Sequence, residues 1–98
     1  MSGEQLVKVS FEVFGRVQGV SFRYYTSEEA NRRGLCGWVE NTPRGTVQGE
    51  IEGPLEQVRG MKRWLESTGS PYSRIERAEF GPEVAVVRNT LQPFDILR

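Results

Sequence analysis

The sequence predicts an α+β fold in which two helices cover one face of an antiparallel sheet. Three observations predict it: a strand-like alternation over residues 7–13, a turn signal at residues 42–45 between two apolar segments, and a helical apolar stripe over residues 55–65. The chain has 98 residues, which is enough for one domain and too few for two. We therefore expect a single domain over residues 1–98.

The first predicted strand and the first predicted helix are joined by a short loop with two glycines. Residues 7–13 alternate apolar and polar side chains, as half-buried strands do. The loop Gly15–Val20 follows, and we interpret Ser21 as the N-cap of a helix that ends at Gly34 in the C′ position. The side chains expected on one side of this helix are Phe22, Tyr25, Thr26 and Ala30.

A hairpin and a second helix follow. Leu35–Glu40 and Thr46–Ile51 are predicted as two antiparallel strands, joined by the turn Thr42-Pro43-Arg44-Gly45. Pro54 suits the first position of the second helix, and Ser70-Pro71 closes that helix. The apolar stripe of the second helix consists of Leu55, Val58, Met61 and Leu65.

The C-terminal third predicts a fourth strand and two short extended pieces. Arg74–Phe80 is the fourth strand, with a bulge because its apolar residues break strict alternation. Val84–Arg88 is an extended excursion, and Phe94, Ile96 and Arg98 indicate a short last strand. The order βαββαβ predicts a ferredoxin-like split βαβ sandwich: an antiparallel sheet, two helices on one face and an extra C-terminal strand.

The amino-acid composition indicates which binding partners and which cellular compartment suit this chain. Lys and Arg total 13, Asp and Glu total 13, and the formal net charge is zero, which argues against a nucleic-acid partner. The single cysteine, Cys36, allows no internal disulfide and suits a reducing compartment. Residues 1–5 are polar and offer no signal peptide or membrane span. We therefore expect a cytoplasmic protein with no membrane partner.

Missing residue types exclude several phosphatase mechanisms. The chain has no histidine, and Asp95 is its only aspartate, so neither a histidine base nor a paired-aspartate nucleophile is available. A Cys-x5-Arg loop starting at Cys36 would need an arginine where Thr42 stands. Ser21 and Cys36 lack a histidine to activate them and are interpreted as a helix cap and a small apolar residue. Few metal ligands remain, so no metal and no cofactor is expected.

The loop between the first strand and the first helix is the candidate anion site. Its residues are Gly15, Arg16, Val17, Gln18, Gly19 and Val20. Glycines let successive N–H groups converge on an anion, and the helix N-terminus adds its free donors. Arg23, in the first helical turn, can reach the same anion with paired charged hydrogen bonds. Taken alone, the glycines favour an ordinary turn over an anion site, and Arg16 favours a solvated loop charge.

Asn41, at the end of the second predicted strand, offers one acceptor and two donors. It can therefore orient a water while donating to a phosphate oxygen. Local turn bonding is the alternative role, and it is the commoner one for asparagine before a turn.

Two ordered segments resemble the signatures of the acylphosphatase family: GRVQGVSFR over residues 15–23 and GWVENTPRGTV over residues 37–47. The similarity extends to Gly53-Pro54, Trp64-Leu65 and Gly69-Ser70-Pro71. The resemblance implies a ferredoxin-like fold and metal-independent hydrolysis of acyl phosphates to carboxylate and inorganic phosphate. It also implies that Arg23 binds the phosphate with the loop amides and that Asn41 orients the attacking water.

The implied reaction suits a chain without histidine. Its leaving group is a carboxylate, whose conjugate acid has a pKa of about 4, so no general acid is needed. Positioning and charge stabilisation are then the main demands. The substrate is a small acyl phosphate, the water's proton can pass to a phosphate oxygen, no covalent intermediate forms, and a monomer suffices.

Two other functions are alternatives to an enzyme. A non-catalytic anion-binding module would keep the loop and Arg23 but would not need Asn41. An RNA-binding module shares the predicted topology, yet residues 46–51 carry no aromatic side chain for base stacking. Asn41 and the neutral net charge favour the enzyme.

Overall fold

The computed structural model describes residues 5–97. The predictions for the polar segment Met1–Glu4 and for Arg98 in the last strand lie outside the described residues. The elements are β1 (Leu6–Arg16), α1 (Phe22–Arg32), β2 (Cys36–Asn41), β3 (Val47–Pro54), α2 (Leu55–Ser67), β4 (Arg74–Phe80), β5 (Val84–Val86) and β6 (Asp95–Ile96).

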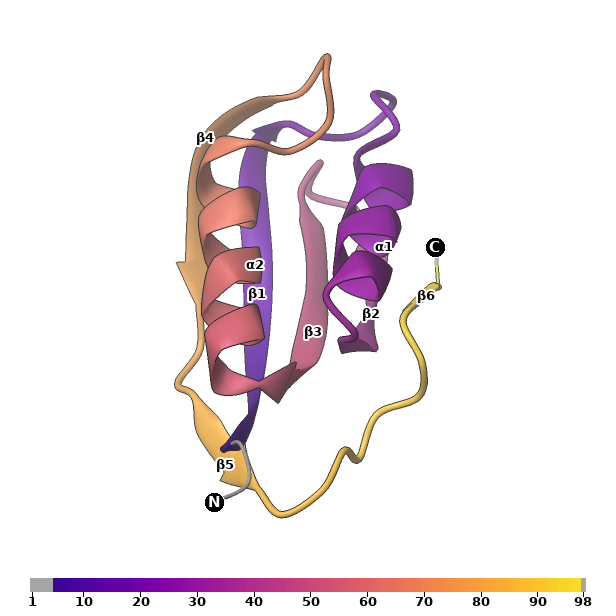
Figure 1. Ribbon diagram of the computed structural model, residues 1–98. Helices are drawn as coiled ribbons and strands as arrows, with labels where there is room; N and C mark the ends of the chain where they lie inside the picture. Colours follow the sequence, from indigo (N-terminus) through magenta and orange to yellow (C-terminus); the bar gives the residue numbers. More distant parts are fainter. Residues whose placement is uncertain (1–4, 98) are drawn as a thin grey trace.

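The strands form one sheet in the order β4-β1-β3-β2-β6, and β5 pairs with the start of β1. Both helices lie on the same face of this sheet (Figure 1), so the predicted split βαβ arrangement is confirmed. Among the described strands the predicted antiparallel pairing is confirmed for all pairs except one, since β6 runs parallel to β2. A long connection rather than a hairpin leads into β6, so its direction is not fixed by a tight turn.

The core lies between the sheet and the helices. Alternate residues of β1 point into it, and α2 contributes the stripe that the sequence predicted. The buried apolar side chains of these two elements are Val7, Val9, Phe11, Val13, Val58, Met61 and Leu65. On α1 the buried residues are Phe22, Thr26 and Ala30. Tyr25 was expected among them, but it is 39% exposed because it lies about 100° around the helix from Thr26.

The ends of the two helices partly match the prediction. Gly34 has φ 71°, and the N–H of Leu35 donates to the Ala30 carbonyl at 2.9 Å, as in a Schellman motif. Ser21 is the N-cap of α1, but its side chain makes no capping hydrogen bond. Pro54 is the N-cap of α2, one position before the predicted one.

A bulge shapes the end of β1. Phe14 pairs with Arg77 and Gly15 pairs with Ile75, so Glu76 is the extra residue in β4. The predicted bulge in β4 is therefore confirmed. Gly15 has φ 128°, and a Cβ there would lie 2.1 Å from the Arg74 carbonyl oxygen. The predicted loop boundary is wrong by two residues, since Gly15 and Arg16 belong to β1 and the loop begins at Val17.

A buried carboxylate fixes the C-terminal segment. Glu52 of β3 is fully buried and accepts hydrogen bonds of 2.7 Å from the Thr90 N–H, the Thr90 hydroxyl and the Leu91 N–H. Further along, the Leu97 N–H donates to the Val39 carbonyl at 2.9 Å. These bonds guide the chain past the edge of the sheet and into β6 (Figure 1).

Candidate active site

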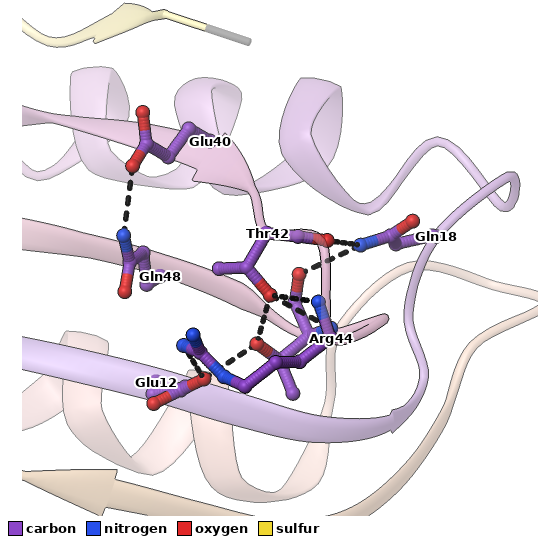
Figure 2. Close-up of polar contacts among 7 residues, drawn as sticks. Glu12, Gln18, Glu40, Thr42, Arg44 and Gln48 are labelled. Atoms are coloured by element: carbon purple, nitrogen blue, oxygen red, sulfur yellow. Dashed lines mark hydrogen bonds and ion pairs between the residues drawn. The ribbon is translucent and has the colours of Figure 1, made fainter.

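The loop between β1 and α1 is anchored at both ends. Val17 is buried in the core, and the Ser70 hydroxyl donates to the Val20 carbonyl at 2.7 Å. Gln18 Nε2 donates to the carbonyls of Thr42 at 2.8 Å and Thr46 at 2.9 Å, which ties the loop to the β2–β3 turn (Figure 2). Only the part around Gly19 projects into solvent.

The backbone of this loop alternates in handedness. Gly19 has φ 74° and Ser21 has φ 59°, whereas Val20 between them has no positive φ. No heavy atom lies within 4 Å of a Cβ built on Gly19, so the glycine serves the backbone conformation and not a close contact. Alternation of this kind turns N–H groups toward a common point, the geometry of an anion-binding concavity.

Arg23 is the second residue of α1 and is half-buried. Its guanidinium makes no hydrogen bond or ion pair with any residue between 5 and 97. It lines a cleft of about 460 Å³ together with Val17, Gly19, Ser21, Phe22, Tyr24 and Ile96. A cation at a helix N-terminus is unfavourable for the helix dipole, and an anion in this cleft would remove that conflict.

Asn41 is the last residue of β2. Its Oδ1 atom is buried and has no hydrogen-bond partner among residues 5–97. An acceptor left in this state costs about 1–3 kcal/mol. The next residue, Thr42, is the one whose carbonyl Gln18 holds, and Ile96 of the Arg23 cleft pairs with Val39 of the same strand. The fold therefore brings Asn41 to the loop and to the neighbourhood of the cleft.

The β2–β3 turn is braced by a network that the sequence did not reveal. The hydroxyls of Thr42 and Thr46 lie 2.6 Å apart, and the Thr46 hydroxyl donates to Glu12 Oε2 at 2.5 Å. Arg44 Nη2 donates to the same carboxylate at 2.7 Å (Figure 2). The Thr46 hydrogen bond, followed by the one from Arg44, holds the pKa of Glu12 below its ordinary value of 4.5. In the sequence, the only sign of this network was a threonine at each end of the turn, Thr42 and Thr46.

Five of the candidate residues are not part of the lining of the Arg23 cleft: Gly15, Arg16, Gln18, Val20 and Asn41. Gly15 is part of the sheet, and Arg16 is exposed and lines a neighbouring cleft. Cys36 lies at the opposite end of β2 from Asn41 and pairs with Glu52. Burial, and then the Glu52 charge, raise the pKa of the Cys36 thiol, which opposes thiolate formation.

The described residues offer neither a cluster of metal ligands nor a membrane-spanning helix. Within this part of the chain, no three His, Cys, Asp or Glu side chains gather where they could hold a metal ion. Neither helix is long and apolar enough to span a membrane.

Together, these features define an α+β sandwich with an arginine-lined cleft at the N-terminus of its first helix. The sequence model of the acylphosphatase family matches residues 9–96. The chain belongs to the acylphosphatase family, which confirms the resemblance and the enzyme class predicted from the sequence.

Individual relatives agree over nearly the whole chain. Acylphosphatase-1 of Mus musculus is 50% identical over 96 residues, covering 98% of this chain and 97% of the relative. Acylphosphatase-2 of Rattus norvegicus is 53% identical over 93 residues, covering 95% and 96%. The crystal structure of acylphosphatase from Bacillus subtilis is 31% identical with a TM-score of 0.83, covering 94% of this chain and 99% of that one.

Proposed function

We propose that this chain hydrolyses acyl phosphates to a carboxylate and inorganic phosphate, with Arg23 and Asn41 as its catalytic residues. The observation that carries the proposal is the buried, unpartnered Oδ1 atom of Asn41, because a hydrogen bond from a water would satisfy that acceptor. The unpaired guanidinium of Arg23 in the adjoining cleft supplies the charge that a phosphoryl group needs.

The phosphoryl group is held from two sides. The backbone amides of residues 17–20 and the guanidinium of Arg23 bind its oxygens, and charge-assisted bonds of this kind are worth about 1.5–3 kcal/mol each. The anchors of the loop at Gln18 and Ser70 keep these donors in place before substrate arrives. Preorganised donors lower the barrier because no reorganisation accompanies the reaction.

The chemical step is a direct in-line displacement. Asn41 Oδ1 accepts a hydrogen bond from the attacking water, whose oxygen forms the new bond to phosphorus. The bond between phosphorus and the acyl oxygen breaks, and its electron pair leaves with the carboxylate. The water's proton passes to a phosphate oxygen, so neither a protein base nor a covalent intermediate is involved.

The test measures hydrolysis of acetyl phosphate, in the presence of a chelator, by the wild type and three variants. Arg23→Ala is expected to weaken inhibition by inorganic phosphate and to lower kcat/KM by about 10²–10³. Asn41→Ala is expected to lower kcat with little change in the inhibition constant for phosphate. Arg63→Ala is the matched control, since Arg63 is an exposed arginine on α2.

The outcomes separate the parts of the proposal. Wild-type kcat in Asn41→Ala would refute the role of that residue, and loss of activity with the chelator would refute metal independence. Turnover in ¹⁸O-labelled water should place the label in phosphate, and label in the carboxylate would contradict attack at phosphorus. The cytoplasmic location, the monomeric state and the single domain over residues 1–98 stay predictions from the sequence.

A further inference from the structure

All three tyrosines of the chain surround the loop between β1 and α1. Tyr24 is 55% exposed, Tyr25 is 39% exposed and Tyr72 is 81% exposed. Tyr24 and Tyr25 come from α1, whereas Tyr72 comes from the α2–β4 connection, which lies at the same end of the sheet (Figure 1). Aromatic surface gathered in one place from separate elements is typical of a binding site.

Tyr25 and Tyr72 line a second cleft beside that of Arg23. It measures about 410 Å³ and is lined by Arg16, Gly19, Val20, Ser21, Tyr25, Pro71 and Tyr72. Gly19 and Ser21 line both clefts. A ligand whose phosphoryl group lies beside Arg23 can therefore extend past Gly19 into the second cleft.

Tyr72 is exposed, but the turn that carries it is anchored. The Ser73 N–H and the Ser73 hydroxyl donate to the Ser70 carbonyl at 3.1 and 2.7 Å. The Ser70 hydroxyl in turn holds the Val20 carbonyl of the loop. The backbone that carries Tyr72 is thus bonded to the loop itself, so binding a ligand against the ring orders only the Tyr72 side chain.

The lining of the second cleft indicates the chemistry of its ligand. Tyr25, Pro71 and Tyr72 offer ring faces and edges, which favour another aromatic ring. Arg16 is the only charged side chain in the lining and has no partner among the described residues. It favours a neutral or anionic ring over a cationic one.

We propose that the cleft between Tyr25 and Tyr72 binds the acyl group of the substrate and selects aryl acyl phosphates over short aliphatic ones. The inference rests on the proposed function, since it assigns the acyl end of the same substrate. An acetyl group ends near Gly19 and leaves the two tyrosines without a contact. A benzoyl group reaches them, so the tyrosines act as specificity-determining residues.

The test is the ratio of kcat/KM for benzoyl phosphate to kcat/KM for acetyl phosphate. We expect Tyr72→Ala and Tyr25→Ala each to lower this ratio by about three- to tenfold relative to the wild type, mainly through a higher KM for benzoyl phosphate. Tyr72→Phe keeps the ring and should keep the ratio. Val87→Ala is the control, because Val87 is 96% exposed and follows β5, which pairs with the opposite end of β1.

The result distinguishes this inference from the proposed function. A wild-type ratio in the Tyr72→Ala, Tyr25→Ala and double variants would overturn the acyl-group cleft while leaving acyl phosphate hydrolysis intact. An equal loss on both substrates gives the same ratio and overturns it as well, since it indicates a structural role. A wild type that hydrolyses neither substrate would overturn both proposals.

Discussion

Glu52 offers the sharpest test of how the C-terminal segment is held. Its carboxylate accepts three hydrogen bonds from Thr90 and Leu91, and bonds to a charged group contribute about 1.5–3 kcal/mol each, so their sum is roughly 4.5–9 kcal/mol. Burying a carboxylate offsets several kcal/mol of this gain. Thr90 is exposed, so its donors regain water when Glu52 is removed. We therefore expect Glu52→Ala to lower the free energy of unfolding by about 2–4 kcal/mol.

The assay is urea unfolding followed by fluorescence. With a slope of about 1–3 kcal/mol per molar urea, the midpoint of Glu52→Ala should fall by about 1 M or more. Amide hydrogen exchange should also show faster exchange at Leu97, whose N–H bonds to the Val39 carbonyl. Glu66→Ala is the control, as an exposed glutamate on α2. A loss below about 0.5 kcal/mol in Glu52→Ala, the size of an ordinary surface effect, would refute the reasoning.

Three further predictions follow from local geometry. Gly15→Ala should destabilise the protein in urea unfolding by about 2–5 kcal/mol, because it combines a positive φ with a backbone overlap. Gln18→Ala removes two hydrogen bonds and should cost about 1–3 kcal/mol, with weaker inhibition by phosphate. Glu12 has a lowered pKa in the folded state, so its contribution is full above 4.5 and is lost as pH falls below that value. Glu12→Gln should therefore flatten the acid limb of a stability–pH curve.

Each of these predictions has a matched control and a contradicting result. In Gly34→Ala the new Cβ has no atom within 4 Å, so the variant should lose only about 1–2 kcal/mol of stability for its positive φ. Equal losses of stability at positions 15 and 34 would contradict the backbone overlap at Gly15. Gln92→Ala should leave the inhibition constant for phosphate unchanged. An unchanged inhibition constant in Gln18→Ala would contradict the role of the two Gln18 hydrogen bonds in holding the loop. Glu66→Gln should leave the acid limb of the stability–pH curve unchanged. An unchanged acid limb in Glu12→Gln would contradict the contribution of Glu12 to stability.

Local patterns in the sequence predicted the elements well, since their signals lie within one turn or one strand. The stripe of α2, the Schellman end at Gly34 and the bounds of β4 are of this kind. The end of β1 was missed because a glycine in a bulge and a glycine in a turn are indistinguishable until the partner strand is known. The parallel direction of β6 was missed because its pairing with β2 joins Trp38 to Asp95 and Val39 to Ile96, which are far apart in the sequence.

In the candidate site, too, local contacts could be predicted from the sequence and contacts between distant segments could not. Arg23 and the loop are adjacent in sequence, so helix and loop chemistry was enough to associate them. The bond from the Gln18 side chain to the Thr42 carbonyl spans 24 residues and follows no periodicity. The position of Tyr72 beside the loop could not be predicted either, because the turn after α2 and the loop are far apart in the sequence and come together only in the fold.

The position of β1 in the interior of the sheet, between β4 and β3, has a consequence for folding kinetics. It pairs with β3, β4 and β5, and Leu6 meets Val86 near the opposite end of the described chain. The entropy of closing these long loops is lost before the contacts form. Refolding should therefore take milliseconds to seconds rather than the microseconds typical of helical bundles. We expect the pairing of β1 with its partner strands to form late in folding.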